Sequence, residues 1–166
     1  MRIRPTIALA ALLSLPLIAV ADDQPSTQQV MSEHKAEIDN HLANIDYKRK
    51  RIVEANMNLT SDEANAFWPI YNTYRSEAEK LSKEHLALIF DYAKAYNTGK
   101  VSDDAAKDLI KRAEKLQDER QDLRSKYIDR IAKDVSPTRA MRFLQIETQL
   151  DAMALLDLAR EVPLAE

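Results

Sequence analysis

The sequence predicts an all-α protein of four helices, whose long antiparallel central hairpin makes it thin or curved rather than a compact bundle. Apolar residues recur at steps of three and four along every long segment after residue 27, and no segment alternates as a β-strand does. Helix-start signals, an aliphatic residue followed by Thr or Ser, fall near residues 60, 102 and 136. The expected helices are therefore 28–56, 61–96, 103–134 and 137–161.

The first expected helix buries one narrow stripe. Its apolar residues Met31, Ile38, Ile45 and Ile52 repeat every seven residues, and Leu42 supports them. Heptad spacing is typical of helices that pack along a single seam. We therefore expect this helix to contact its neighbours along one face only.

The second helix begins with a capping box. We expect the hydroxyl of Thr60 to accept from the backbone N–H of Glu63, the Glu63 carboxylate to reach back to the N–H of Thr60, and Leu59 to pack on the first turn. Ser136 before Pro137 marks the start of the fourth helix in the same way. Capping roles are therefore expected for Leu59, Thr60, Glu63 and Ser136.

Pro69 lies inside the second helix. Because proline has no N–H, it cannot bond to the carbonyl of Asn65, so we expect a bend after Trp68. One continuous seam runs along this helix and consists of Phe67, Tyr71, Tyr74, Ala78, Leu81, His85, Leu88 and Tyr92.

A short turn at Gly99 makes the second and third helices antiparallel. If the chain folds back symmetrically around this glycine, Tyr71 lies opposite Tyr127. Arg120 then lies beside the small Ala78, and its charged end extends to solvent.

The N-terminus has the pattern of a secretory signal peptide over residues 1–21. Arg2 and Arg4 form its charged start, residues 7–20 its apolar stretch, and a small-x-small cleavage site ends at Ala21. The stretch is too short for a stable transmembrane helix. We therefore expect cleavage after Ala21 and no stable membrane insertion of the remaining chain.

After the expected cleavage the chain consists of a polar leader, residues 22–27, and a single helical domain, residues 28–166. Loss of the two signal arginines changes the formal charge from −3 to −5. Without Cys, the chain forms no disulfide and has no cysteine for a lipid anchor. Export led by arginines is typical of bacteria, so we expect a soluble periplasmic protein.

The composition excludes several classes of function. With one Gly the chain contains neither of the glycine-rich nucleotide loops, and with no Cys it cannot form thiolate metal sites. A formal charge of −3 provides no basic field for nucleic acid. The three histidines are scattered, and no carboxylate pair shares an apolar cleft. We therefore expect no enzymatic activity, no cofactor and no nucleic-acid partner.

His34, Glu37 and His41 share one face of the first helix, and imidazole with carboxylate suits zinc, nickel or copper. The two histidines lie about 10 Å apart along the helix axis. One ion cannot bind both without a second chain or segment. We therefore favour a solvated polar strip and keep a metal site as the alternative, and we expect His85 to be a core histidine.

The densest basic run consists of Lys48, Arg49, Lys50 and Arg51. Four successive helical residues cannot all face one way, so the run is first interpreted as a solvated helix face. The alternative is a docking patch for acidic segments of a partner or for anionic lipid headgroups.

Phe67 and Trp68 belong to an aromatic cluster with Tyr71 and Tyr74, next to the Pro69 bend. Core packing is the default interpretation of aromatic residues at this spacing. A thin hairpin cannot cover both faces of long helices, however, so part of this apolar surface is expected to bind a partner.

The chain resembles the Spy/CpxP-like superfamily of bacterial periplasmic helical proteins, which carry repeated LTxxQ motifs. The resemblance rests on LTSDE at residues 59–63, on the basic helix end at residues 49–53 before it, and on the long hairpin behind it. Two further segments, FWPIY at residues 67–71 and RFLQIE at residues 142–147, are similar to an uncharacterised branch of that group.

Two departures from the family motif concern its capping role. Glu63 replaces the Gln of the motif, and either side chain closes a capping box. In the second copy, VSPTR at residues 135–139, Arg139 stands where the reciprocal acceptor should be. The motif is therefore first a device that starts a helix.

The resemblance implies an ATP-independent chaperone. Such a protein is a curved antiparallel homodimer that holds unfolded or misfolded periplasmic proteins through apolar and basic helix surfaces. Other relatives imply two alternatives: an envelope-stress regulator that docks on the periplasmic domain of a sensor kinase, and a periplasmic metal-binding protein. We rank the chaperone first, the regulator second and metal binding third.

Overall fold

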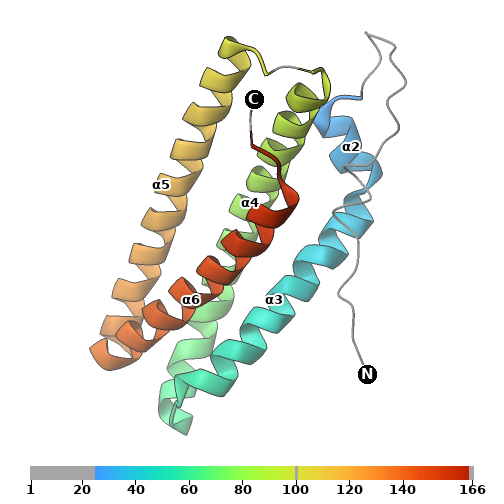
Figure 1. Cartoon of the computed structure of the whole chain (residues 1–166). Coiled ribbons are helices and arrows are strands. Elements are labelled where there is room, and N and C mark those ends of the chain that lie inside the picture. The colour runs from blue at the N-terminus through green and yellow to red at the C-terminus, as the bar shows by residue number, and fades with distance from the viewer. Residues whose placement is uncertain (1–24, 100, 165–166) are drawn as a thin grey trace.

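The computed structural model describes residues 25–99 and 101–164, and this part of the chain is all-helical. Helix α5 runs antiparallel to α4, and α6 returns between α5 and α3 (Figure 1). The signal peptide expected over residues 1–21 lies outside the described residues. The helices are α2 (Thr27–Glu33), α3 (Lys35–Met57), α4 (Ser61–Asn97), α5 (Asp103–Asp134) and α6 (Pro137–Glu161).

The described part of the chain contains five helices, so the expected number of four is wrong. The first expected helix is divided at His34, whose backbone has φ −98° and ψ 17°. The backbone bonds continue across the break, because the His34 N–H bonds to the carbonyl of Val30 at 3.0 Å and the His34 carbonyl accepts from Ile38 at 3.0 Å. The break allows α2 to lie against α4, where Thr27 donates to Asp91. No Gly or Pro marks this break in the sequence.

The expected capping signals are present at the helix starts. Thr60 accepts from the N–H of Glu63 at 3.3 Å, and Glu63 accepts from the N–H of Thr60 at 2.9 Å. Ser136 accepts from the N–H of Arg139 at 3.2 Å, with Pro137 at the first helical position. The ends of α4 and α6 that carry these caps are therefore defined by short-range bonds.

The core occupies one end of the molecule, where the α3–α4 and α5–α6 connections meet. Phe143 of α6 lies edge-on against Phe67, Tyr71 and Tyr74, with ring centroids 5.8, 6.1 and 5.6 Å apart. Edge-to-face aromatic pairs add stability beyond the area that they bury. The other buried members of this cluster are Val53, Met57, Ile70, Tyr127, Ile131, Ala140, Ile146 and Leu150.

The opposite end of the molecule is loosely packed. No described side chain is fully buried in α4 beyond Tyr74, in α5 before Leu116 or in α6 after Leu150. Most of the apolar residues of α4 in this region, including Leu81, are half-buried. The helices are therefore held firmly at the core end and leave apolar surface accessible at the other.

The α4–α5 hairpin has a different register from the one expected around Gly99. Tyr127 packs on Tyr74, with ring centroids 5.5 Å apart, and donates to Glu77 at 2.7 Å, so it lies about one turn beyond Tyr71. The connection that includes Gly99 runs from residue 98 to residue 102, so the chain does not fold back symmetrically around the glycine. Gly99 has φ 92°, which suits a residue without a side chain.

Helix α4 continues through Pro69 to Asn97. The Pro69 carbonyl accepts a bond from the hydroxyl of Thr73 at 2.9 Å.

None of the helices in the described ranges is both long enough and apolar enough to cross a membrane.

Loss of the capping bond should weaken the start of α4. We expect Thr60→Ala to lower the free energy of unfolding by about 1 kcal/mol, because it leaves an N–H of the first turn without its side-chain acceptor. Urea denaturation followed by circular dichroism measures this change. The adjacent Ser61→Ala is the control and should change stability by less than about 0.5 kcal/mol. Equal effects of the two substitutions would contradict the capping role.

Candidate functional site

A buried ion pair joins three helices on the side of the core that faces the loosely packed end of the molecule. Glu147 of α6 is 0% exposed, and its Oε2 accepts from the Arg49 guanidinium of α3 at 2.7 Å and from the Tyr74 hydroxyl of α4 at 2.9 Å. A buried carboxylate without such partners would be strongly destabilising. The pair therefore fixes how α3, α4 and α6 lie relative to one another.

Asp151, one turn after Glu147, extends this pair to a fourth helix. Its Oδ1 accepts from Arg49 at 2.8 Å, and its Oδ2 accepts from Arg124 of α5 at 3.1 Å. Desolvation by burial acts to lower the pKa of the Arg49 guanidinium, but the charges of Glu147 and Asp151 and the bonds to them raise it above its ordinary value. We call Arg49, Arg124, Glu147 and Asp151 the ionic layer.

Sequence reasoning missed the two carboxylates of the ionic layer. A signal was present, because Glu147 follows Phe143 by four residues and precedes Leu150 by three, which places it on the apolar row of α6. A charged residue on the buried row of a helix requires a partner of opposite charge. The identity of that partner, 98 residues away in the sequence, is not visible in any local pattern.

The basic run does not form one patch. Arg49 has only 12% of its side chain exposed and is engaged in the ionic layer, so its expected role in binding a partner is wrong. Lys48 is exposed, Arg51 is exposed and pairs with Glu54 at 3.2 Å, and Lys50 lies over the ring of Trp68 at 5.6 Å. Successive residues of α3 point in different directions, as helical geometry requires.

The aromatic pair that was expected to bind a partner is also divided. Phe67 is 0% exposed in the core, so a partner cannot contact it in the folded protein, and that expectation is wrong. Trp68 is half-buried and packs edge-on against Phe67 at 5.1 Å and Tyr71 at 5.5 Å. Trp68 with Lys50 is therefore the accessible part of this region.

The histidines do not assemble a metal site in the described residues. His34 Nδ1 lies 3.1 Å from a carboxylate oxygen of Glu37, while His41 is exposed, and no group of three possible ligands is found in residues 25–99 and 101–164. His85 is half-buried. Desolvation, followed by the positive charge of Arg120, lowers the pKa of His85 to about 4, so this imidazole is neutral at pH 7.

The segments at residues 59–63 and 135–139, which start α4 and α6, bind each other. The guanidinium of Arg139 donates to both carboxylate oxygens of Glu63, at 3.0 and 2.9 Å, and to the carbonyl of Met57 at 3.1 Å. The bond from Arg139, with the capping bond from Thr60, lowers the pKa of Glu63 to about 2. Arg139, which departs from the motif, therefore joins the end of α3 and the starts of α4 and α6.

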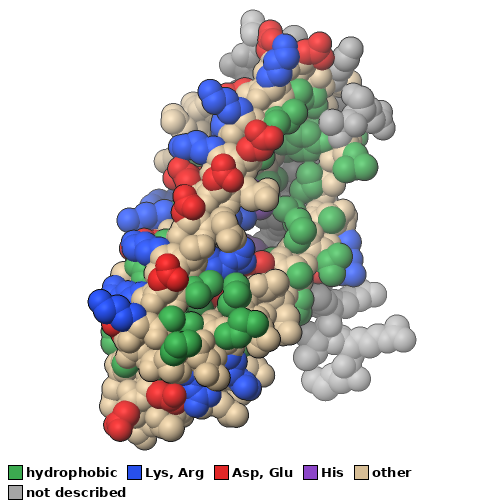
Figure 2. All heavy atoms as spheres, turned by 90° about the vertical axis from the view of Figure 1, so that its left-hand side faces the viewer, with side chains coloured by type: hydrophobic (Ala, Val, Ile, Leu, Met, Phe, Trp, Pro, Cys, Tyr) green, Lys and Arg blue, Asp and Glu red, His purple; other side chains and the backbone are tan. Residues whose placement is uncertain are grey.

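Exposed apolar side chains gather on the second half of α6. Met153, Leu155 and Leu156 are 60%, 66% and 62% exposed, and Ile110 of α5 is 57% exposed. Figure 2 views the molecule from the side of α5 and shows hydrophobic side chains along both sides of a hollow in its middle. An accessible apolar surface of this kind is typical of a site that binds a partner.

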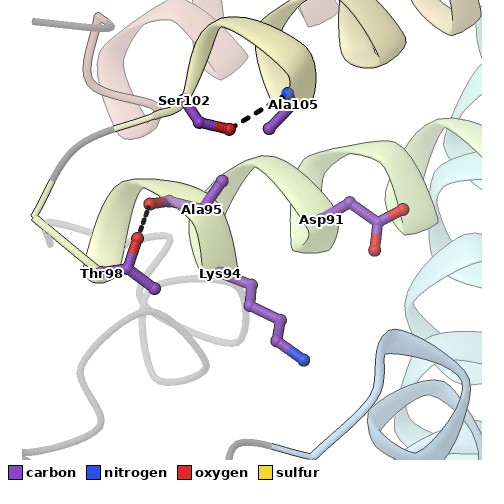
Figure 3. Close-up of a pocket in the computed structure, with 6 residues that line it drawn as sticks. All are labelled: Asp91, Lys94, Ala95, Thr98, Ser102 and Ala105. Atoms are coloured by element: carbon purple, nitrogen blue, oxygen red, sulfur yellow. Dashed lines mark hydrogen bonds between the residues drawn. The ribbon is translucent and has the colours of Figure 1, made fainter. Parts of the chain in front are cut away.

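A cavity of about 340 Å³ lies at the α4–α5 turn (Figure 3). Its polar side chains are engaged in structural bonds. The Ser102 hydroxyl accepts from the N–H of Ala105 at 3.2 Å, Thr98 donates to the carbonyl of Ala95 at 2.7 Å, and Asp91 pairs with Arg112 at 2.7 Å. These side chains stabilise the turn.

The ionic layer predicts that two neighbouring residues of the basic run, Arg49 and Lys48, differ in their contribution to stability. We expect Arg49→Ala to lower the free energy of unfolding by about 3–5 kcal/mol, because it leaves the buried Glu147 charge without its cation. Lys48→Ala, in the preceding position, should change it by less than about 0.5 kcal/mol. Chemical denaturation of both variants measures the difference.

A second variant tests whether lost charge compensation is the cause. Arg49→Met combined with Glu147→Met removes both charges and keeps apolar volume, so it should regain most of the stability lost in Arg49→Ala. A double variant as unstable as Arg49→Ala would show that packing of the Arg49 side chain, rather than its charge, is what matters.

The Glu63–Arg139 bond should make stability depend on pH. The pKa of Glu63 is about 2 in the folded protein and about 4.5 without its partners, so the bond stabilises the fold above pH 4.5 and the effect is lost as pH falls toward 2. We expect Arg139→Gln to be less stable than the parent at pH 7 and the difference to shrink over that pH range. Lys133→Gln is the control, and a difference independent of pH would exclude the ionised carboxylate as the cause.

Comparisons with family models, with curated proteins and with solved structures returned no match to this chain. The resemblance to the Spy/CpxP-like superfamily therefore rests on the motif residues 59–63 and on the helical hairpin behind them.

Proposed function

We propose that this protein is an ATP-independent, chaperone-like protein of the bacterial periplasm. In this proposal it holds unfolded polypeptides on apolar and basic helix surfaces. The observation that carries the proposal is the group of large apolar side chains left exposed on α6, namely Met153, Leu155 and Leu156. Unfolded chains expose apolar segments, and burial of those segments against this surface would favour association.

The composition and the open end of the molecule support this mode of action. With one Gly the chain has no glycine-rich nucleotide loop, so client release would depend on weak contacts rather than on ATP. Exposed methionine and leucine side chains adapt to many partners, because they repack without requiring one fixed shape. Such a surface suits clients that share no sequence.

Three basic residues of the run remain candidates for contacting acidic segments of a client. Lys48 and Arg51 are exposed, and Lys50 lies beside the half-buried Trp68. Charges at the rim of a binding surface mainly increase the rate of encounter. Clients would therefore be attracted by these charges and held by apolar contacts.

An aggregation assay tests the proposal. We expect the purified protein, without ATP, to reduce light scattering by a chemically denatured client. The variant with Met153, Leu155 and Leu156 all replaced by Ser should suppress aggregation several-fold less, since each exposed apolar side chain contributes about 1.5–3 kcal/mol when fully buried. The matched control replaces the exposed Ala152, Ala154 and Ala159 of the same helix by Ser, and it should suppress as well as the parent.

A second pair of variants tests the basic residues without disturbing the ionic layer. Lys48, Lys50 and Arg51 are changed to Gln while Arg49 is kept, and the control changes Lys107, Lys111 and Lys115 of α5. A loss of suppression at low salt in the first variant alone would support a role in encounter. If the parent does not suppress aggregation at several-fold molar excess, the chaperone proposal is wrong, and binding to a sensor-kinase periplasmic domain becomes the next test.

A further inference from the structure

The ionic layer has two guanidinium groups and two carboxylates, and a third guanidinium lies beside it. Both oxygens of Asp151 are occupied, one by Arg49 and one by Arg124, and Glu147 already accepts from Arg49 and Tyr74. Arg120 of α5 is the next guanidinium, and within residues 25–99 and 101–164 it has no hydrogen bond or ion pair. Arg120 is therefore a third guanidinium beside two carboxylates that it does not contact, and Glu147 keeps one buried oxygen without a hydrogen bond.

Arg120 faces this layer rather than extending away from it. Its charge interacts with Asp151 of α6, Arg49 of α3 and Tyr74 of α4, and it lowers the pKa of His85 on α4. The residue is solvent-accessible, yet desolvation by the surrounding protein lowers the pKa of its guanidinium. Accessibility and desolvation together are expected of a side chain at the bottom of a concave surface.

The rows of residues that lead from Arg120 toward the open end are apolar. On α5 the row of Arg120 continues through Leu116 to Leu109, and the burial of Leu116 shows that this row faces inward. On α4 the row of His85 continues to Leu88, and on α6 the row of Glu147 and Asp151 continues to Leu158. Leu88, Leu109 and Leu158 are all only half-buried.

A second cavity lies beyond Leu88, at the last turns of α4. This cavity has a volume of about 170 Å³ and is lined by apolar and aromatic residues of α4 and by the segment after α6, including Tyr92, Tyr96 and Pro163. The Tyr92 hydroxyl donates to the carbonyl of Pro163 at 2.8 Å, which holds that segment in place. Tyr92 lies one heptad after His85, so the cavity continues the same row of α4.

We propose that Arg120 and the apolar rows above it form a binding site for a single-chain carboxylate amphiphile, a fatty acid. The carboxylate pairs with the guanidinium of Arg120, whose charge no ion pair with the ionic layer compensates. The aliphatic chain lies along Leu88, Leu109 and Leu158 toward Tyr92. This site borders the proposed client-binding surface, because Leu155 lies between Asp151 and Leu158 on the same row of α6.

The length of the apolar path indicates how long the aliphatic chain of the fatty acid can be. The rise from the level of His85 to Tyr92 is about 10 Å, and to Tyr96 it is about 16 Å. A fully extended chain advances about 1.2 Å per single bond, so these spans correspond to roughly eight to thirteen bonds. A chain of about twelve carbons therefore matches the path.

Titration calorimetry of the full chain with dodecanoate, kept below its micelle concentration, tests this site. We expect saturable binding near one equivalent, weaker binding of octanoate because fewer methylenes are buried, and weaker binding of dodecan-1-ol because it carries no charge. Arg120→Gln should weaken dodecanoate binding by about tenfold, the usual effect of losing a hydrogen bond to a charged group. Arg120→Lys keeps the charge and should retain most of the affinity.

The matched control is Arg130→Gln, which removes an exposed arginine of the same helix that pairs with Asp134. It should leave dodecanoate binding unchanged, and unchanged circular dichroism of all three variants establishes that they are folded. No binding of dodecanoate, or binding reduced equally by Arg120→Gln and Arg130→Gln, would overturn the proposal. It would also be overturned if an apolar peptide with one Glu bound in an Arg120-dependent manner while dodecanoate did not, because the occupant would then be a polypeptide.

Discussion

The arrangement of the helices depends on the buried carboxylate of Glu147. A charge with no access to water must be compensated within the protein, and here Arg49 and Tyr74 do so from two other helices. A slip of α3 along α6 by one turn would leave this carboxylate unpaired in apolar surroundings. The apolar residues of α3 define its register less strictly, because Ile45 and Ile52 of the expected stripe are 40% and 38% exposed and only Ile38, Val53 and Met57 are buried. The ion pair therefore selects one register among several that apolar packing permits.

The ionic layer is also a boundary between two kinds of packing. On one side, Phe143 and the aromatic residues of α4 form a closed core, and the Glu63–Arg139 bond joins the helix starts at the end of this core. On the other side the described helices bury no side chain completely except Ile38 and Leu116. Since stability comes mainly from burial, the core end holds the fold together and the open end keeps accessible surface. A surface that binds other molecules can then be exposed without loss of the fold.

Local features of this fold were predictable from the sequence, whereas long-range pairings were not. The bonds between Thr60 and Glu63 join residues only three positions apart, so the local sequence alone predicts them. The division at His34 arises from the docking of α2 on α4, where Thr27 meets a residue 64 positions away. The burial of Arg49 likewise depends on a carboxylate of another helix. Charge runs and aromatic stripes define a helix face, and only the tertiary fold decides which side chains on it remain exposed.

Arg139 at the start of α6 contributes to long-range packing rather than to the cap of its own helix. Arg139 cannot close a capping box as Gln or Glu would, so the start of α6 relies on Ser136 alone for its side-chain cap. In exchange, the guanidinium reaches the carboxylate that closes the box of α4 and the last turn of α3. A neutral residue at this position could not hold Glu63 ionised at low pH. The segments at residues 59–63 and 135–139 thus stabilise the closed end of the molecule, while the residues on which binding would depend, on α6 and at Arg120, lie outside them.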